Sequence, residues 1–183
     1  MIHKMNTQGF LEVTLGPMFS GKTSHLIALY KQYRLSGMSV CVVNYSEDTR
    51  YSDHELVAHD GQKIECVRHL KLSEVALKYD VYLVNEAQFF ADLVDVVKEW
   101  VDVHKKIVHC SGLDGDFKRR PFGSILELIP FADVVKKSTA ICMGCKNGTM
   151  AIFTKRIIAS EDIKVIGGSE SYMPVCRKCY LES

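Results

Sequence analysis

The sequence predicts an α/β fold in which a parallel sheet is flanked by helices and followed by a small zinc-binding domain. Strand and helix patterns alternate as far as residue 138, which is typical of a parallel sheet covered on both faces. A glycine-rich motif lies between the first strand and the first helix, and two Cys-x-x-Cys pairs lie near the end of the chain. We therefore expect two domains, at residues 1–138 and 139–183.

The bulk composition limits the class of protein. The chain has 183 residues, of which 47% are hydrophobic, so it can bury a sizeable core. Its 23 basic and 22 acidic residues give a formal charge of +1, which provides no general attraction to nucleic acid or membranes. The amino terminus, MIHKMNTQG, lacks the apolar core of a signal peptide, and no run approaches the length of a membrane span. We expect a soluble cytoplasmic protein that binds neither membranes nor nucleic acid.

The first strand pattern, Phe10–Leu15, leads into the octapeptide GPMFSGKT at residues 16–23, which matches G-x-x-x-x-G-K-[ST] at each fixed position. In such a loop the glycines let successive N–H groups point into one concavity, and the next helix directs its positive dipole end there. The sequence therefore predicts the phosphate-binding loop of the P-loop NTPases. Lys22 would reach the terminal phosphates, and the Thr23 hydroxyl would ligate magnesium.

The remaining elements follow in chain order. The helix after the glycine loop carries Leu26, Leu29, Tyr30 and Tyr33 at helical spacing, and we expect it to end at Gly37. We expect strands at residues 40–43, 64–67, 81–84, 107–111 and 132–135, and helices at residues 73–78, 92–104 and 125–129, the last ended by Pro130. Residues 44–63 form a polar stretch, and loops of this length are often functional or mobile.

The polar residues after the strand at 81–84 give a second chemical signal. A carboxylate often follows this strand beside a P-loop and helps to hold magnesium, but Asn85 stands at that position here. Glu86 is the ionisable group at the strand end, so we predict that it acts as a general base or as an acid linked to the metal. A surface glutamate that caps the next segment fits the same pattern.

The two Cys-x-x-Cys pairs, Cys142 with Cys145 and Cys176 with Cys179, supply four thiolates for a tetrahedral zinc ion. Residues 146–175 lie between the pairs, so a sizeable loop must be carried between them. Disulfides are the competing use, which the expected intracellular location disfavours. Four cysteines would fill the coordination of zinc, so we predict a structural site. The other cysteines lie in or beside apolar runs and are expected in the core: Cys41, Cys66 and Cys110.

Seven segments carry a resemblance to a known family. They are GPMFSGKT (16–23), DTRY (48–51), NEAQFF (85–90), GLDGDFKRRPFG (112–123), CMGC (142–145), TKR (154–156) and VIGGSESYMPVCRKCY (165–180). In this order and combination the chain resembles the type II thymidine kinases of animals, bacteria and large DNA viruses, over nearly its whole length. The poxviral and animal members look especially similar.

The resemblance implies a function and a set of site residues. Similar enzymes transfer the γ-phosphate of ATP to the 5′-hydroxyl of thymidine, form dTMP in nucleotide salvage, and are homotetramers. ATP and magnesium would be held by Gly16, Pro17, Met18, Phe19, Ser20, Gly21, Lys22, Thr23, Asp48, Arg50 and Asn85, with Glu86 as the base. The nucleoside would contact Met18, Phe89, Leu113, Phe117, Thr154 and Tyr172, and the main chain of Val165, Ile166 and Gly167 on a lasso between the zinc ligands.

Asn85 departs from the family pattern, which has aspartate at this position. Asparagine can accept a hydrogen bond from a magnesium-bound water, but it brings no negative charge, so magnesium affinity or turnover can fall. Two other functions stay open. One is a nucleotide-binding homologue that is weak or inactive in catalysis. The other is a P-loop ATPase whose zinc ribbon binds nucleic acid, for which the short basic runs at 118–120 and 136–137 offer little support.

Overall fold

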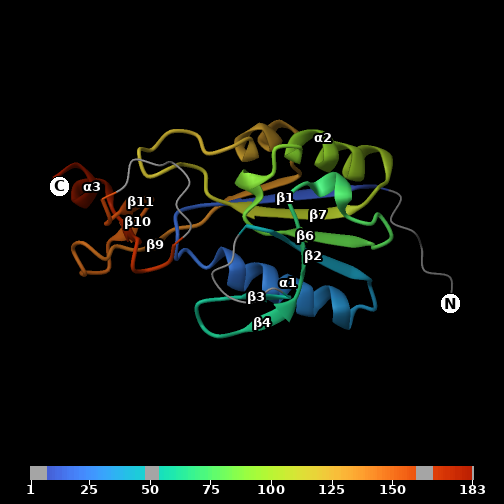
Figure 1. Cartoon of the computed structure of the whole chain (residues 1–183), viewed down its shortest axis with the longest axis horizontal. Coiled ribbons are helices and arrows are strands. Elements are labelled where there is room, and N and C mark those ends of the chain that lie inside the picture. The colour runs from blue at the N-terminus through green and yellow to red at the C-terminus, as the bar shows by residue number, and fades with distance from the viewer. Residues whose placement is uncertain (1–7, 48–53, 160–166, 183) are drawn as a thin grey trace.

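The computed structural model describes residues 8–47, 54–159 and 167–182. Its centre is a six-stranded sheet in the order β5-β2-β6-β7-β1-β8 (Figure 1). The strands are β1 (Phe10–Leu15), β2 (Val40–Tyr45), β5 (Val67–His69), β6 (Val81–Val84), β7 (Ile107–Gly112) and β8 (Val134–Lys137). Each neighbouring pair is parallel, which confirms the predicted parallel sheet.

One face of the sheet is covered by α1 (Lys22–Leu35) and by the hairpin of β3 (Glu55–Val57) and β4 (Lys63–Glu65) (Figure 1). Leu26 and Ile27 of the helix pack with apolar side chains of the hairpin and the sheet, and both are almost fully buried. Beyond its last turn the chain reaches Gly37, whose φ of 83° lies in the left-handed region that favours glycine, close to the expected helix end.

The opposite face is covered by α2 (Leu93–Lys98), by its π-helical continuation Glu99–Val103, and by a 3-10 helix at Ile125–Phe131 (Figure 1). The helix expected at 92–104 is thus confirmed. Four of its apolar residues are buried: Leu93, Val97, Trp100 and Val101. The Trp100 ring lies 4.4 Å from that of Tyr82, between centroids, and so joins the helix to the middle of the sheet. Both faces are therefore covered, as predicted.

The helix predicted at residues 73–78 is wrong. A single 3-10 turn, Leu72–Glu74, stands there, followed by an extended residue, Val75, and by a turn at residues 77–78. The buried Tyr82 hydroxyl donates to the carbonyl of Ala76 at 2.9 Å and accepts the N–H of Tyr79 at 3.1 Å. Because a side chain satisfies these backbone groups, they need no helical partners.

The single strand predicted at residues 64–67 is two strands. Residues 63–65 form β4, which pairs antiparallel with β3, whereas residues 67–69 form β5, which pairs parallel with β2. The polar stretch at 44–63 accordingly contains β3 and the end of β2. Strands of three residues are too short to display an alternating pattern, so the sequence does not reveal their partners.

The expectation that Pro130 ends its helix is wrong. The 3-10 helix continues to Phe131, because its last hydrogen bond runs from the N–H of Ala132 to the carbonyl of Ile129 and does not need the N–H that proline lacks. The last strand of the sheet occupies residues 134–137 rather than 132–135.

The chain beyond β8 forms two small antiparallel pairs and a short helix, beside the end of the sheet (Figure 1). The pairs are β9 (Ala140–Ile141) with β10 (Met150–Ala151) and β11 (Phe153–Arg156) with β12 (Tyr172–Val175), and α3 spans Arg177–Leu181. We call residues 139–182 the C-terminal segment. The predicted division at 138/139 into two domains remains a prediction. Among the described residues, no helix has the length and apolarity needed to cross a membrane.

A buried polar network lies between the sheet and α1. Glu12 on β1 is only 5% exposed, and its carboxylate accepts hydrogen bonds from His25 and Lys136, both at 2.8 Å. Burial alone would raise its pKa, but these hydrogen bonds, together with the nearby His109, outweigh burial and hold the pKa of Glu12 at about 2. Glu12 therefore stabilises the fold above its ordinary pKa of 4.5, and this contribution is lost as the pH falls from 4.5 toward 2.

We predict that Glu12→Gln lowers the free energy of unfolding at pH 7 by roughly 2 kcal/mol, the scale of hydrogen bonds to a charged group. The variant should also lose less stability than the wild type between pH 4.5 and pH 2. Urea denaturation across this pH range measures both effects. Glu99→Gln is the control, because the Glu99 carboxylate is exposed. Equal stability of wild type and Glu12→Gln at pH 7 would contradict this account.

Candidate active site

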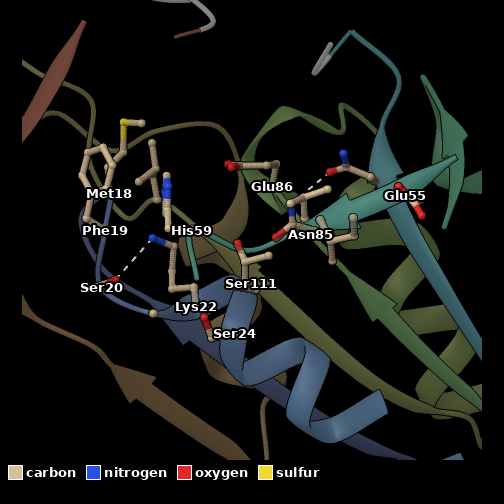
Figure 2. Close-up of a pocket in the computed structure, with 16 residues that line it drawn as sticks. Met18, Phe19, Ser20, Lys22, Ser24, Glu55, His59, Asn85, Glu86 and Ser111 are labelled. Carbon is tan, nitrogen blue, oxygen red and sulfur yellow. Dashed lines mark hydrogen bonds between the residues drawn. The ribbon is translucent and has the colours of Figure 1, made fainter. Parts of the chain in front are cut away.

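A cavity lies at the carboxyl edge of the sheet (Figure 2). The glycine loop at residues 16–23 forms one side, and Asn85 and Glu86, which follow β6, lie across from it. Nine of the predicted site residues line this cavity together: Met18, Phe19, Ser20, Gly21, Lys22, Thr23, Asn85, Glu86 and Leu113. Glu55 and His59, which the sequence did not single out, line it as well.

The backbone of the glycine loop requires glycine at its two fixed positions. Gly16 has a φ of 147°, and a Cβ atom there would lie 2.5 Å from the carbonyl oxygen of Ser138. Gly21 has a φ of 79° directly before α1. The Lys22 ammonium donates to the carbonyls of Gly16 at 3.0 Å and Pro17 at 2.7 Å, so it lies against the loop beside the start of the helix. A lysine and a helix N-terminus in one concavity can bind an anion such as phosphate.

Glu86 is held in an unusual backbone conformation. Its φ of 52° and ψ of 42° place a non-glycine residue in the left-handed region, directly after β6. Such conformations persist where the surrounding structure holds them, often at functional sites. Its carboxylate accepts a hydrogen bond from the Gln88 amide at 2.7 Å. Gln88 is 4% exposed, and its own amide oxygen accepts the N–H of Leu113 at 3.0 Å. Gln88 therefore fixes the carboxylate relative to the loop after β7.

Two glycines make room for Gln88. A Cβ atom on Gly112 would lie 2.3 Å from the Gln88 amide oxygen, and one on Gly123 would lie 1.9 Å from the Gln88 carbonyl oxygen. Gln88 lies within the NEAQFF segment, but no role for it was predicted from the sequence. The only sign of its role in the sequence is that the 112–123 segment begins and ends with glycine. The sequence does not reveal which residue these glycines contact.

Asn85 is paired with a second asparagine. Its Nδ2 donates to Oδ1 of Asn44 at 2.9 Å, and the two side chains are 4% and 2% exposed. The pairing follows from the sheet register, because Val43 of β2 lies opposite Val84 of β6 and an asparagine follows each. The Asn85 carbonyl oxygen is the end of the amide that faces away from this bond. Asn44 also lines the cavity, and the sequence analysis missed it.

Five of the predicted nucleoside residues lie outside the lining of this cavity. Thr154 on β11 accepts the N–H of Met18 at 3.0 Å and so ties the C-terminal segment to the glycine loop. Phe89 packs against Tyr45 and Phe122, each with a centroid separation of 5.3 Å. The other three are Phe117, Gly167 and Tyr172. Gly16 and Pro17 of the glycine loop are not among the lining residues either. Four further predicted residues lie outside the described part of the chain: Asp48, Arg50, Val165 and Ile166.

Phe117 and Tyr172 meet at one buried arginine. The Arg156 guanidinium carbon lies 3.8 Å from the centroid of the Phe117 ring, and the guanidinium donates to the Tyr172 hydroxyl at 2.8 Å. Gly167 packs closely on Ser171, next to Tyr172; a Cβ atom on it would lie 2.4 Å from the Ser171 hydroxyl oxygen. Three of the residues predicted to contact the nucleoside thus lie close together, where the loop that carries Phe117 meets the C-terminal segment.

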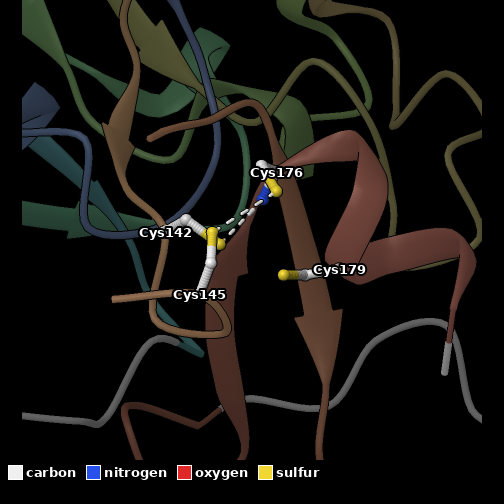
Figure 3. A group of neighbouring side chains, drawn as sticks. All are labelled: Cys142, Cys145, Cys176 and Cys179. Carbon is white, nitrogen blue, oxygen red and sulfur yellow. Dashed lines mark hydrogen bonds between the residues drawn. The ribbon is translucent and has the colours of Figure 1, made fainter. Parts of the chain in front are cut away.

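The four predicted zinc ligands form a cluster (Figure 3). Their sulfur atoms all lie within 4.8 Å of one another, and those of Cys145 and Cys176 are 3.8 Å apart. Zinc–sulfur bonds of about 2.3 Å imply tetrahedron edges of about 3.8 Å. None of the seven cysteines, all of which lie in the described part of the chain, forms a disulfide. Cys142, Cys145, Cys176 and Cys179 can therefore hold a zinc ion.

The backbone around the cluster favours the thiolate form of Cys142. The N–H of Cys176 donates to the Cys142 sulfur at 3.2 Å. Burial raises the pKa of the Cys142 thiol, but backbone hydrogen bonds from Cys145 and Cys176 outweigh it and lower that pKa to about 6. The thiolate is the form that binds metals. By contrast, Cys41 and Cys110 are buried in the core as expected, and Cys66 is partly buried against it.

Comparison with known proteins identifies the family. The thymidine kinase family matches residues 9–180 of the chain. A thymidine kinase of Yaba monkey tumor virus (strain VR587) is 41% identical over 97% of this chain and 98% of its own length. Thymidine kinase 1 of Dictyostelium discoideum is 40% identical over 94% of this chain and 78% of its own. The cytosolic thymidine kinase of Homo sapiens is 38% identical over 96% and 75%. The chain belongs to the thymidine kinase family.

Proposed function

We propose that the protein is an ATP-dependent thymidine kinase that transfers the γ-phosphate of ATP to the 5′-hydroxyl of thymidine and so forms dTMP. One observation carries the proposal. A lysine-bearing glycine loop and the carboxylate of Glu86 face each other across one cavity, in a chain whose relatives are thymidine kinases. The loop provides a phosphate site, and the carboxylate provides a proton acceptor for the hydroxyl that attacks.

The phosphates of ATP bind at residues 16–23 as in a P-loop. Phosphoryl transfer depends mainly on positioning and on neutralising the charge of the phosphates, which are the tasks of Lys22 and of the N–H groups at the start of α1. Magnesium would be held by the Thr23 hydroxyl and, through water, by the Asn85 carbonyl oxygen. It would supply further positive charge at the phosphates. By the family resemblance, Asp48 and Arg50 contribute to binding of the phosphates and magnesium.

Glu86 acts as the general base. It accepts the proton of the 5′-hydroxyl as that oxygen attacks the γ-phosphorus and the bond to the β-phosphate oxygen breaks. The hydrogen bond from Gln88 keeps the carboxylate oriented, which matters because general-base catalysis needs a short hydrogen bond to the reacting hydroxyl. Leu113 is tied to the same glutamine, so the base and a wall of the nucleoside pocket are placed together.

The nucleoside lies between the cavity and the C-terminal segment. Met18, Phe89, Leu113, Phe117 and Tyr172 provide its apolar walls, with Thr154 near the thymine methyl group. Main-chain groups of residues 165–167 bond the edge of the base, as the family resemblance implies. A closed loop of this kind also excludes water, which competes with the hydroxyl as phosphoryl acceptor.

The four-cysteine cluster binds one structural zinc ion, which anchors the C-terminal segment. We further propose a homotetramer in the cytoplasm, by likeness to the family and to the cytosolic human enzyme. The oligomeric state and the location rest on resemblance. Sedimentation at micromolar concentration tests the oligomeric state.

The function is tested by ADP production with ATP and magnesium in the presence of thymidine, deoxycytidine, single-stranded DNA or no acceptor. We expect turnover that depends on thymidine. Nucleotide binding without turnover would support the alternative of a homologue that is weak or inactive in catalysis because Asn85 replaces aspartate. Turnover stimulated by DNA alone would support the nucleic-acid-dependent ATPase.

We predict that Glu86→Gln preserves folding and ATP binding but lowers turnover about 100- to 10,000-fold, the usual contribution of a general base. The amide keeps the shape of the side chain but cannot accept the proton. Steady-state kinetics and nucleotide titration measure the two effects. Glu127→Gln, at an exposed position, is the matched control. Wild-type turnover in Glu86→Gln would remove Glu86 from the mechanism.

Asn85→Asp should lower the magnesium concentration needed for half-maximal rate, because it adds a negative charge near the cation in a water-poor site. The carboxylate cannot donate to Asn44, so the Asn44 amide must turn and present its Nδ2 to the new oxygen. Asn85→Ala, which has no acceptor, should raise the magnesium requirement. The rate measured as a function of magnesium concentration shows whether each variant lowers or raises the magnesium requirement. Identical profiles in all three proteins would show that position 85 does not tune the metal.

We expect about one zinc ion per chain, lost in Cys176→Ser but retained in Cys66→Ser, which alters a cysteine outside the cluster. Loss of the metal should weaken thymidine binding more than ATP binding, because the ligands lie in the C-terminal segment and not in the glycine loop. Elemental analysis and calorimetric titration make these measurements. Purified protein without zinc, with the four thiols oxidised to disulfides, would reverse the assignment.

A further inference from the structure

The Phe117 residue lies on the loop at residues 113–122, yet two groups of the C-terminal segment hold it. The Tyr180 hydroxyl donates to the Phe117 main-chain carbonyl at 2.7 Å, across 63 positions of the chain. On its side chain, the Arg156 guanidinium stacks over the ring at 3.8 Å. One contact therefore fixes the backbone of Phe117 and the other fixes its ring.

Tyr180 is itself fixed by the cysteine cluster. It follows Cys179 on α3, a helix of only five residues. Helices this short are not stable alone, so the position of α3 depends on what anchors it. Two of the four clustered cysteines, Cys176 and Cys179, lie at its start and within it. The Tyr180 ring also packs on Phe153 of β11, at 5.2 Å between centroids.

Arg156 is held just as firmly. It is 9% exposed, lies opposite Tyr172 in the β11–β12 register, and donates to the Tyr172 hydroxyl at 2.8 Å. The planar guanidinium can stack on one ring and bond a hydroxyl at once, which a lysine ammonium cannot reproduce. Both aromatic residues that Arg156 joins are walls of the proposed nucleoside pocket.

The loop that carries Phe117 has its own internal frame. The Asp116 carboxylate is 6% exposed and accepts the N–H groups of Lys118 and Arg120, each at 2.8 Å. The loop therefore has hydrogen bonds of its own that support its local shape. What Tyr180 and Arg156 add is its placement relative to the C-terminal segment, so changing either residue should move Phe117 without unfolding the loop.

We propose that Tyr180 and Arg156 are positioning residues that set the Phe117 wall of the nucleoside pocket, and that Tyr180 transmits the state of the cysteine cluster to this wall. The inference rests on the proposed function, because it assigns the pocket to a nucleoside. It predicts that the state of the cysteine cluster changes nucleoside affinity more than ATP affinity.

The test compares Tyr180→Phe and Arg156→Lys with the wild-type holoprotein. Tyr180→Phe keeps the ring and removes the hydrogen bond, and should raise the thymidine Kd and KM about threefold to tenfold. Arg156→Lys should raise both about tenfold, because it loses the stacking and the bond to Tyr172. In both variants kcat, the KM for ATP and the zinc content should stay at wild-type values. Tyr79→Phe, at the far end of β6, is the matched control and should change nothing.

Metal removal gives a second readout, made by calorimetric titration with thymidine and without turnover. Chelation should weaken thymidine binding in the wild type and weaken it less in Tyr180→Phe, which lacks the hydrogen bond to Phe117 but keeps the contact of the ring with Arg119. Equal chelation effects in the two proteins would overturn the transmission through Tyr180. Wild-type thymidine affinity in both variants would overturn the positioning role while leaving the kinase intact. A wild-type protein that does not bind thymidine would overturn the proposed function and this inference together.

Discussion

The parallel direction of the central strands is the constraint on which the rest of the molecule depends. Both faces of the sheet are covered, so only its edges can present polar groups to a ligand. In a parallel sheet the carboxyl ends of all the strands meet at the same edge. The glycine loop, Asn44, the Asn85–Glu86 pair and Ser111 each lie at or just beyond the end of a different strand, so one edge gathers all of them.

Accordingly, the residues at strand ends were the part of the site that could best be predicted from the sequence. The motif at 16–23 and Glu86 needed only a strand pattern before them, and the fold supplied their proximity. Hydrogen-bond partners that tertiary packing brings together could not be predicted. Gln88, Asn44 and Tyr180 each act through one long-range hydrogen bond, and a single sequence does not reveal such bonds. The same reason explains the false helix at 73–78, where one tyrosine hydroxyl replaced the helical partners of the backbone.

Two hydrogen bonds are among the contacts that join the C-terminal segment to the site. Thr154 accepts the N–H of Met18 in the glycine loop, and Tyr180 donates to the carbonyl of Phe117. The segment has a small core of its own, built from Ala140, Ala151, Val175 and two of the clustered cysteines. A metal ion bound by four thiolates can supply the rigidity that so few apolar side chains cannot. The cysteine cluster therefore matters for the geometry of the cavity without lining it.

The central claim is that the cavity presents the 5′-hydroxyl of a nucleoside to both Glu86 and the phosphate loop. The most direct measurement compares 3′-deoxythymidine with 5′-deoxythymidine as acceptors, with the products identified by phosphorus NMR. We expect a 5′-monophosphate from 3′-deoxythymidine and no nucleoside phosphate from 5′-deoxythymidine, which should bind and inhibit. Phosphorylation of 5′-deoxythymidine, or no transfer to either compound while ATP is hydrolysed, would contradict it.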